Sequence, residues 1–418
     1  MMFFVLAALA LSLFAASPAH ADEVDTDKYD FILAGNVQFD TEPVEGVLIL
    51  VEGPGTNVKV KTDAAGQWRV GVPTKDVYTV TLVEDSLPDG VVVAEGNATV
   101  EVEFGLSPTK VVNFFLGEGV RETVSFFDQF LNRFVNGVNF GLLLALAAIG
   151  LSLIYGTTGL SNFAHSEMIT FGALMAMAFT VVLNLPVWLG ILIAIALSGA
   201  FGWGLDATLW KPLRRRGVGV IPLMIVSIGL SLALRYLYQF FVGGGTTQLP
   251  GAGMADIDLG PIGLSPIDLA SMATSIVVLL AVGFFLLRTR IGKATRAVAD
   301  NPSLASASGI DVDRVIRIVW ILGGTLAGLS GILWAYFRPG VNWDMGFQIL
   351  LLIFAAVVLG GLGTAFGALI GALIVGVFVE VSTLWIASDL KYVAALVVLI
   401  IVLLFRPEGI LGRRERIG

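Results

Sequence analysis

The chain has 418 residues, of which 56% are hydrophobic and only 14% charged, and its mean hydropathy is +0.86. Soluble domains are typically about 45–50% apolar and about 25% charged, so this composition indicates a protein largely embedded in lipid. The absence of cysteine excludes disulfides and thiolate metal sites, and a net charge of −8 offers no basic surface for nucleic acid.

The first residues predict a secretory signal. Residues 1–16 are almost wholly apolar, and the Ala-x-Ala pattern that ends at Ala21 is typical of a signal-peptidase site. No Lys or Arg precedes the apolar run, so a first transmembrane helix is the alternative. About 16 apolar residues fall short of the roughly 20 needed to cross a bilayer. We therefore expect residues 1–21 to be a signal peptide.

Residues 22–118 have the pattern of a small extracytoplasmic all-β sandwich domain. Alternating runs separated by turn residues indicate roughly seven strands, five of them at 47–51, 58–62, 67–70, 78–82 and 98–102. The phrase Thr62-Asp63-Ala64-Ala65-Gly66-Gln67-Trp68, followed by Val77-Tyr78-Thr79-Val80, resembles the carboxypeptidase regulatory-like (transthyretin-like) sandwich family.

The charge of this β domain differs from that of the rest of the chain. It holds 18 acidic and 6 basic residues, a net charge of −12, whereas residues 119–418 carry a net charge of +4. No Asp-x-Asp-x-Asp-Gly loop is present, so the carboxylates are interpreted as a solvated surface rather than as calcium ligands. We expect a binding or spacing module without a metal.

Residues 119–136 predict an amphipathic interfacial linker helix. Phe126, Phe130 and Phe134 recur at helical spacing, opposite Asp128 and Arg133. Such a helix fits the outer membrane interface, and a helix packed on the sandwich is the alternative.

Residues 137–418 predict a polytopic α-helical membrane domain of about 8–10 spans. Because lipid cannot satisfy backbone polar groups, each apolar stretch of spanning length should be a helix. These stretches lie at 137–157, 163–184, 186–209, 219–242, 269–288, 316–337, 347–362, 365–384 and 391–405.

Three basic clusters predict the orientation in the membrane. They lie at 211–216, 288–317 and 406–416, and an even number of predicted spans separates each from the next. All three therefore share one side, which the excess of Lys and Arg makes the cytoplasm. Three spans precede the first cluster, so the N-terminal domain should lie outside and the C-terminus inside. We expect a multi-pass protein of the bacterial plasma membrane.

Ionisable residues inside the predicted spans are few. Asn162, His165 and Glu167 crowd one short stretch, and such residues are candidates for a translocation path. A helix-capping and packing role is equally open. We interpret three other charged residues as interfacial side chains that reach toward water, namely Arg235, Asp206 and Glu380.

Glycines recur at small-xxx-small spacing near the end of the chain. Gly360, Gly361 and Gly363 indicate tight helix packing, with exposed backbone along a translocation path as the alternative.

The loop at 288–317 predicts a helical hairpin on the cytoplasmic face. Its sequence indicates a short Ala-rich helix, a break at Asn301-Pro302 and a second helix that stops at Gly309. Such a hairpin is a surface on which a partner could dock, although a structured connector is equally compatible.

Four motifs resemble ABC importer permeases of the branched-chain amino acid type. The stretch Asn162-Phe163-Ala164-His165-Ser166-Glu167 is similar to the family's Asn-x-Ala-His-Gly-Glu, with Ser166 in place of glycine. The Gly-rich segment at 358–367 and the C-terminal signature at 406–412 also match. The loop matches the family's coupling loop at Gly292, Ala294, Arg296, Ala297, Ala299, Ala305, Gly309 and Ile310.

The resemblance implies a transport subunit rather than an enzyme. Its partners would be two cytoplasmic ABC ATPase subunits, a second homologous permease and an extracytoplasmic solute-binding protein, within membrane lipid. ATP and Mg would bind the ATPases, because this chain has no Gly-x-x-x-x-Gly-Lys-Ser/Thr loop and is expected to bind no cofactor. The residues expected to couple to the ATPases are Gly292, Lys293, Arg296, Ala299, Gly309 and Ile310.

The resemblance predicts import of branched-chain or other small neutral amino acids. Urea and short-amide permeases look very similar, so they remain an alternative. A membrane-anchored receptor acting through the β-sandwich would need one anchor helix, and about nine spans argue against it. A secondary transporter should show an inverted repeat or intramembrane acids, and neither is clear.

Overall fold

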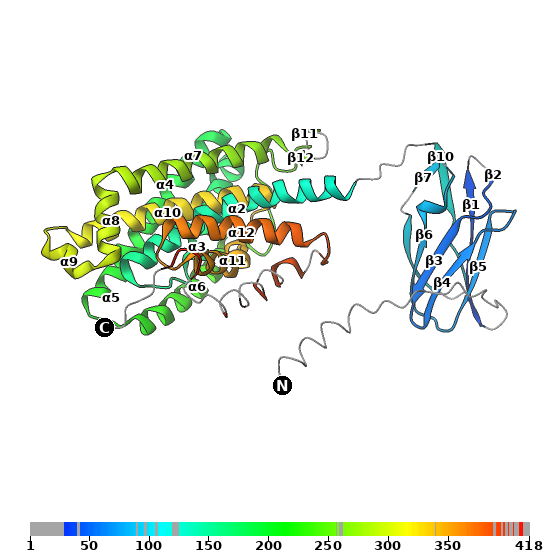
Figure 1. Cartoon of the computed structure of the whole chain (residues 1–418), viewed down its shortest axis with the longest axis horizontal. Helices are drawn as coiled ribbons and strands as arrows, with labels where there is room; N and C mark the ends of the chain where they lie inside the picture. Colours follow the sequence, from blue (N-terminus) through cyan, green and yellow to red (C-terminus); the bar gives the residue numbers. More distant parts are fainter. Residues whose placement is uncertain are drawn as a thin grey trace. The chain divides into compact units, whose positions relative to one another are not determined.

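The structure is a computed structural model that describes residues 29–39, 42–88, 91–95, 98–104, 108–118, 125–255, 257–258, 262–338, 340–387, 390–393, 396–397, 400, 404 and 409–412. The chain divides into two compact units, Met1–Thr123 and Val124–Gly418 (Figure 1). The predicted signal peptide, residues 1–21, lies outside the described residues.

The first unit contains two β-sheets. Its strands are β1 (Phe31–Phe39), β2 (Glu42–Pro43), β3 (Leu48–Gly53), β4 (Thr56–Lys61), β5 (Gln67–Val72), β6 (Val77–Leu82), β7 (Val91–Glu95), β8 (Thr99–Glu103), β9 (Thr109–Val111) and β10 (Phe114–Glu118). One sheet has the order β2-β1-β10-β7, with β5 and β9 also paired to β1. The other sheet has the order β4-β3-β6-β8, with antiparallel neighbours throughout.

Every second side chain of a strand points to the same face of its sheet. The buried side chains of the two sheets pack together in one core. Trp68 and Val70 of β5 are buried in a cluster with Ile49 and Val51 of β3, which belongs to the other sheet. The five strand runs predicted from sequence are confirmed as β3, β4, β5, β6 and β8.

The second unit is a helical bundle. Its helices are α2 (Phe126–Thr158), α3 (His165–Met177), α4 (Val187–Leu205), α5 (Lys211–Arg215), α6 (Val220–Val242), α7 (Pro266–Arg288), α8 (Arg290–Asp300), α9 (Pro302–Ala307), α10 (Val312–Phe337), α11 (Met345–Gly360) and α12 (Ala365–Ser382). The π-helical turns η3 (Ala178–Val182) and η4 (Asp206–Trp210) extend α3 and α4. A two-stranded hairpin, β11 (Ile257–Asp258) and β12 (Gly263–Leu264), lies between α6 and α7.

Among the described residues, seven helical segments are long and apolar enough to cross a membrane. They include every predicted span up to residue 384 except the one at 347–362, where α11 has only 16 residues. The ninth predicted stretch, 391–405, lies mostly outside the described residues.

The predicted linker helix is continuous with the first span. Residues 126–136 form the first turns of α2, which has 33 residues and no break at residue 137. Helix α12 packs directly on the backbone of Gly137, where an added Cβ would lie 2.7 Å from Val377 Cα. Residues 119–124 lie outside the described residues.

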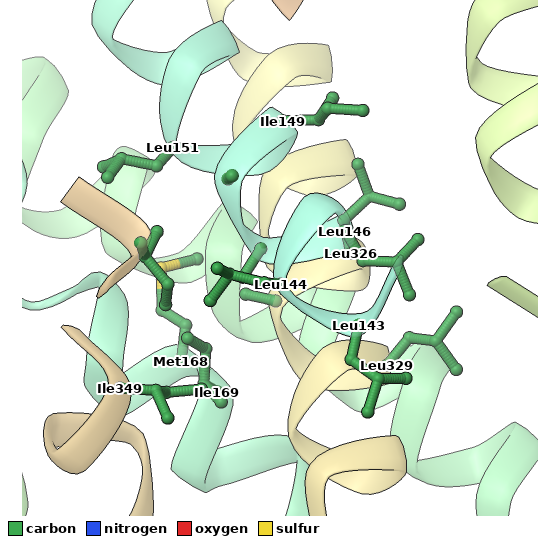
Figure 2. Packing of buried hydrophobic residues seen from close by; sticks show 14 of the residues in the cluster. Leu143, Leu144, Leu146, Ile149, Leu151, Met168, Ile169, Leu326, Leu329 and Ile349 are labelled. Carbon is green, nitrogen blue, oxygen red and sulfur yellow. The ribbon is translucent and has the colours of Figure 1, made fainter. Parts of the chain in front are cut away.

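The centre of the bundle is formed by α2, α3, α10 and α11. Figure 2 shows Leu143 and Leu146 of α2 beside Leu326 of α10, and Ile169 of α3 beside Ile349 of α11, all within one buried cluster. Glycines bring the backbones of α3 and α10 into contact, where Gly172 lies against Gly328.

Helix α3 begins inside the bundle rather than at its end. The His165 ring lies 3.0 Å from the backbone oxygen of Ala147, which is 11 residues before the end of α2 at Thr158. Eleven helical residues correspond to about 16 Å. The non-helical segment 159–164 therefore runs back alongside α2, and the first turn of α3 lies deep among the helices.

Candidate functional site

A buried ion pair joins the first turn of α3 to α6. Glu167 is fully buried, and its Oε1 accepts hydrogen bonds from Ser231 Oγ at 2.9 Å and Ser166 Oγ at 3.1 Å. The Arg235 guanidinium donates to the same oxygen from Nη2 at 3.2 Å and from Nε at 3.3 Å. Within the described part of the chain, Glu167 Oε2 has no hydrogen-bond partner.

Further contacts hold this pair in place. Arg235 Nη2 also donates to Ser231 Oγ, and its guanidinium carbon lies 3.6 Å from the centroid of the Phe347 ring on α11. The Tyr238 hydroxyl donates to the backbone oxygen of Glu167 at 3.1 Å. We call Ser166, Glu167, Ser231, Arg235 and Tyr238 the Glu167 cluster. It connects α3 and α6 through charge-assisted and neutral hydrogen bonds, and the contact of Arg235 with the Phe347 ring extends it to α11.

The interpretation of Arg235 as an interfacial side chain that reaches toward water is wrong. Its side chain is 11% exposed and is paired with Glu167, 68 positions earlier in the chain. A sequence signal did exist, because Ser231, Arg235 and Tyr238 are spaced i, i+4 and i+7, which places them on one face of α6. That face packs against α3.

Asn162 and His165 do not join the Glu167 cluster. Asn162 Oδ1 accepts a hydrogen bond from the Ala164 backbone N–H at 3.2 Å, which stabilises the turn before α3. His165 Nε2 contacts the Ala147 backbone oxygen, as described above. Ser166, at the family's glycine position, donates from Oγ to the Phe163 backbone oxygen as well as to Glu167.

Gly360, Gly361 and Gly363 form a tight turn away from the Glu167 cluster. Gly361 and Gly363 have φ values of +111° and +77°, a region that favours glycine. The C-terminal segment pairs with this turn, because the Leu411 N–H donates to the Gly360 oxygen at 2.9 Å. Gly363 packs on Gly156, near the end of α2.

Helices α8 and α9 form a hairpin at that same end of the bundle. Asn301 ends α8 and caps α9, because its Oδ1 accepts from the Leu304 N–H at 2.9 Å. Gly309 then turns the chain with a φ of +84°. This is the helix–break–helix pattern that the sequence predicts, with α8 following α7 directly and α9 leading to α10.

The hairpin has a buried inner face. Gly292 packs against the backbone of Phe285 and Leu286, where a Cβ would overlap α7. Val298 is fully buried and forms a small core with Ala305 and Val315. Two expected coupling residues belong to this inner side, because Ile310 packs on that core and the Ala299 Cβ lies beside Gly156.

The outer face of the hairpin combines basic and apolar side chains. Lys293 and Arg296 of α8 are exposed. Leu304 at the tip of α9 is 65% exposed, and Ile291 is 39% exposed. Sequence reasoning missed Leu304 because an apolar residue in a short amphipathic helix is normally interpreted as core.

Two basic clusters that lie far apart in the sequence meet near the hairpin. Asp313, at the start of α10, pairs with Lys211 Nζ at 3.0 Å and with Arg215 Nη2 at 2.8 Å. The clusters at 211–216 and 288–317 thus lie at the same end of the bundle, where the orientation argument expects them.

Asp206 and Glu380 are also paired rather than exposed to water. Asp206 is 1% exposed and accepts from Arg214 Nη2 at 2.6 Å. Glu380 is 4% exposed and lies 2.7 Å from Lys391 Nζ. The expectation that these side chains reach toward water is therefore wrong, because each carboxylate is buried and is paired with a cation instead. No described group of three or more acidic or His side chains is placed to hold a metal ion.

Apolar helices of spanning length with internally paired charges define a multi-pass membrane protein. Residues 133–403 match the family described as branched-chain amino acid transport system / permease component. The chain belongs to this ABC permease family, so it is a permease component, binds no cofactor itself and is not itself an ATPase. The family implies ATPase and binding-protein partners.

Named relatives show the extent of the likeness. The chain is 33% identical over 302 residues to the high-affinity branched-chain amino acid transport system permease protein LivH of Salmonella typhimurium, covering 69% of this chain and 97% of that protein. It is 32% identical over 300 residues to the corresponding protein BraD of Pseudomonas aeruginosa, with the same shares. The ribose import permease protein RbsC of Escherichia coli is 28% identical over 240 residues, covering 56% of this chain and 72% of that protein.

Proposed function

We propose that this chain is the transmembrane subunit through which an ATP-driven importer moves branched-chain or other small neutral amino acids. Family membership supports the transport role, and the names of LivH and BraD support the substrate class. The observation that carries the mechanism is the α8–α9 hairpin, whose inner face packs on the bundle while its outer face is exposed.

The outer face of the hairpin is suited to docking a cytoplasmic ATPase subunit. Leu304 provides an apolar anchor, and Lys293 and Arg296 provide charge around it. Interfaces commonly combine a central apolar anchor with a charged rim. In the assembly that the family resemblance implies, two ATPases would bind two permeases, this chain and a homologous one.

The inner face of the hairpin transmits its movement to the bundle. Helix α8 contacts α2, α7 and α10, and Gly292 packs tightly against the end of α7. Closure of the ATPases on ATP would displace the hairpin and with it these helices. The energy that favours one state of the permease comes from nucleotide bound to the partner.

The Glu167 cluster is the candidate gate of the translocation path. A helix that begins inside the bundle places its first turn at membrane depth, where transporters commonly place substrate contacts. Glu167 lies in that turn and is tied to α6, so separating α3 from α6 requires this ion pair to break. Asn162, His165 and the glycines at 360, 361 and 363 serve mainly to shape the backbone around the path.

The orientation follows from the same proposal. The hairpin and the clusters at 211–216 and 288–317 face the cytoplasm, as the positive-inside rule requires. The acidic β unit then lies outside, where a solute-binding protein delivers the substrate.

The proposal is tested by reconstituting the full chain with its candidate ATPases, second permease and binding protein in proteoliposomes. Three single variants of the hairpin are compared: Lys293→Glu, Arg296→Glu and Leu304→Asp. Each should abolish ATPase association and ATP-dependent leucine uptake. Arg69→Glu, an exposed reversal on β5, is the matched control and should change neither.

The wild-type result also decides the substrate class. Leucine uptake that depends on ATP supports the proposal, whereas uptake of urea without leucine would replace it with the urea alternative. Normal ATPase association by all three hairpin variants would overturn the docking role of the hairpin.

A further inference from the structure

A cavity lies at the end of the bundle opposite the α8–α9 hairpin. Its volume is about 580 Å³, and its lining includes Arg133, Asp268, Trp334, Phe337, Arg338 and Glu380. Arg133 is 25 residues before the end of α2, a helical distance of about 37 Å from the hairpin end. A bilayer core is about 30 Å thick, so the cavity and the hairpin belong to opposite membrane faces.

The acidic residues of the cavity already have partners. Glu380 pairs with Lys391, which is also part of the lining, at 2.7 Å. Asp268 accepts from Ser265 Oγ at 2.6 Å and from Asn139 Nδ2 at 3.0 Å. Both carboxylates are thus held in fixed positions on the cavity wall, where each keeps lone pairs able to accept from a cation.

The two arginines of the cavity are differently placed. Arg133 and Arg338 are exposed, and none of the ion pairs within the described residues involves either of them. The lining therefore has three cationic and two acidic side chains, with both guanidinium groups open to a ligand. Guanidinium groups bind carboxylates with paired, charge-assisted hydrogen bonds.

One wall of the cavity is apolar and is formed by aromatic rings that pack on one another. Trp334 and Phe337 stack with their ring centroids 5.7 Å apart, and Phe140 of α2 packs on both rings. Such a wall suits an aliphatic side chain. Ligand pockets of about 300–1,000 Å³ with a few convergent polar groups are typical of small-molecule sites.

We propose that this cavity is a receiving site for a zwitterionic α-amino acid on the permease. The substrate carboxylate binds between Arg133 and Arg338, the ammonium faces Asp268 and Glu380, and the side chain lies against Trp334 and Phe337. The proposal rests on the proposed function and deepens it, because it predicts selection for a zwitterion over an uncharged amide such as urea.

An anionic lipid headgroup shares the carboxylate's chemistry and could also contact the two arginines. The acidic side chains of the same wall favour the amino acid, since they repel a phosphodiester but attract an ammonium group. The aromatic wall fits both. The experiment therefore needs one arm for each source of negative charge.

The test measures the Kd of L-leucine for the complete permease–ATPase complex in nanodiscs without binding protein. Arg133→Gln and Arg338→Gln should each weaken binding about tenfold or more, because each removes a charged carboxylate donor. Arg216→Gln, an exposed arginine at the hairpin end, should leave the Kd unchanged. Leucinamide, which lacks the carboxylate, should bind the wild type as weakly as leucine binds the arginine variants.

The variant Glu380→Gln tests the part of the site that binds the ammonium group separately from the part that binds the carboxylate. It should weaken leucine binding but not the binding of isovalerate, which has no ammonium group. Thermal unfolding and ATPase association of each variant show whether the complex is intact.

Repeating the titrations in nanodiscs with and without phosphatidylglycerol distinguishes the sources. If both arginine variants bind leucine normally but lose retained phosphatidylglycerol, the cavity is a lipid site and the proposal is overturned. Leucine uptake by the wild type together with unchanged Kd values in both variants would overturn the cavity site alone. Absence of wild-type uptake would instead reject the proposed function.

Discussion

The β unit and the helical bundle are held together in different ways. The core of the β unit consists of large side chains that alternate along strands, such as Trp68, Tyr78 and Phe114. In the bundle, helices also meet backbone to backbone. Gly172 of α3 lies against Gly328 of α10, where an added Cβ would overlap the partner backbone.

The difference reflects the solvent of each unit. In water, removal of apolar surface stabilises a fold at about 25 cal/mol per Å². Lipid tails are as apolar as leucine, so helices in a membrane associate through close packing and internal hydrogen bonds instead. The bundle accordingly contains the buried Glu167–Arg235 and Asp206–Arg214 pairs, whereas the described core of the β unit contains no ion pair.

The largest expected effect comes from removing one partner of a buried pair. Arg235→Gln leaves the Glu167 carboxylate buried without a counter-charge, which typically costs about 3–5 kcal/mol. In thermal unfolding of the purified full chain in detergent, the bundle of this variant should melt at a lower temperature than that of the wild type. Arg216→Gln is the exposed control, and equal stability of both variants would contradict a role of the pair in holding α3 to α6.

The β unit should respond to loss of a large core side chain. Trp68→Ala removes an indole that is 2% exposed, and such truncations cost about 3–5 kcal/mol. Because the units have separate cores, limited proteolysis should detect unfolding of residues 31–118 while the bundle stays intact. Arg69→Ala on the opposite face of β5 should have little effect, and joint unfolding of both units would contradict separate cores.

A larger residue at a helix contact tests the backbone packing of the bundle. Gly172→Leu forces α3 and α10 apart, and overpacking of this kind costs about 1–3 kcal/mol. Gly204→Leu is the matched control, because a Cβ at Gly204 meets nothing within 4 Å. Monodispersity in size-exclusion chromatography and the melting temperature should fall for the first variant only.

The smallest expected effect lies at the start of α7. Ser265 and Asp268 form a capping box, with the Asp268 N–H donating to Ser265 Oγ at 3.1 Å. Ser265→Ala should cost about 1 kcal/mol, as at other N-caps. Ser308→Ala is the control, because that exposed hydroxyl only donates to Leu304 within its own turn. A melting temperature unchanged by Ser265→Ala would mean that packing alone fixes this end of α7.

Local sequence patterns were sufficient to predict most of the membrane spans, the hairpin helices and five of the strands. Runs of apolar residues fixed the spans, Asn301-Pro302 and Gly309 bounded the hairpin helices, and alternation located β3 to β6 and β8. Strand β1 was missed because Gly35 and Asn36 interrupt its apolar pattern. Gly35 is needed there because a Cβ would overlap the Val112 oxygen. Each successful prediction used information contained within a few neighbouring residues.

Only the tertiary structure decided which charges meet. Glu167 pairs with Arg235 across 68 positions, and the cavity opposite the hairpin takes its charged side chains from α2, α7 and α12 and from Arg338 and Lys391, which lie outside the named helices. The structure alone likewise shows that residues 126–136 continue into α2 and that α12 packs on Gly137. Periodicity tells which face of a helix is polar, but the partner of that face depends on how all the helices pack together.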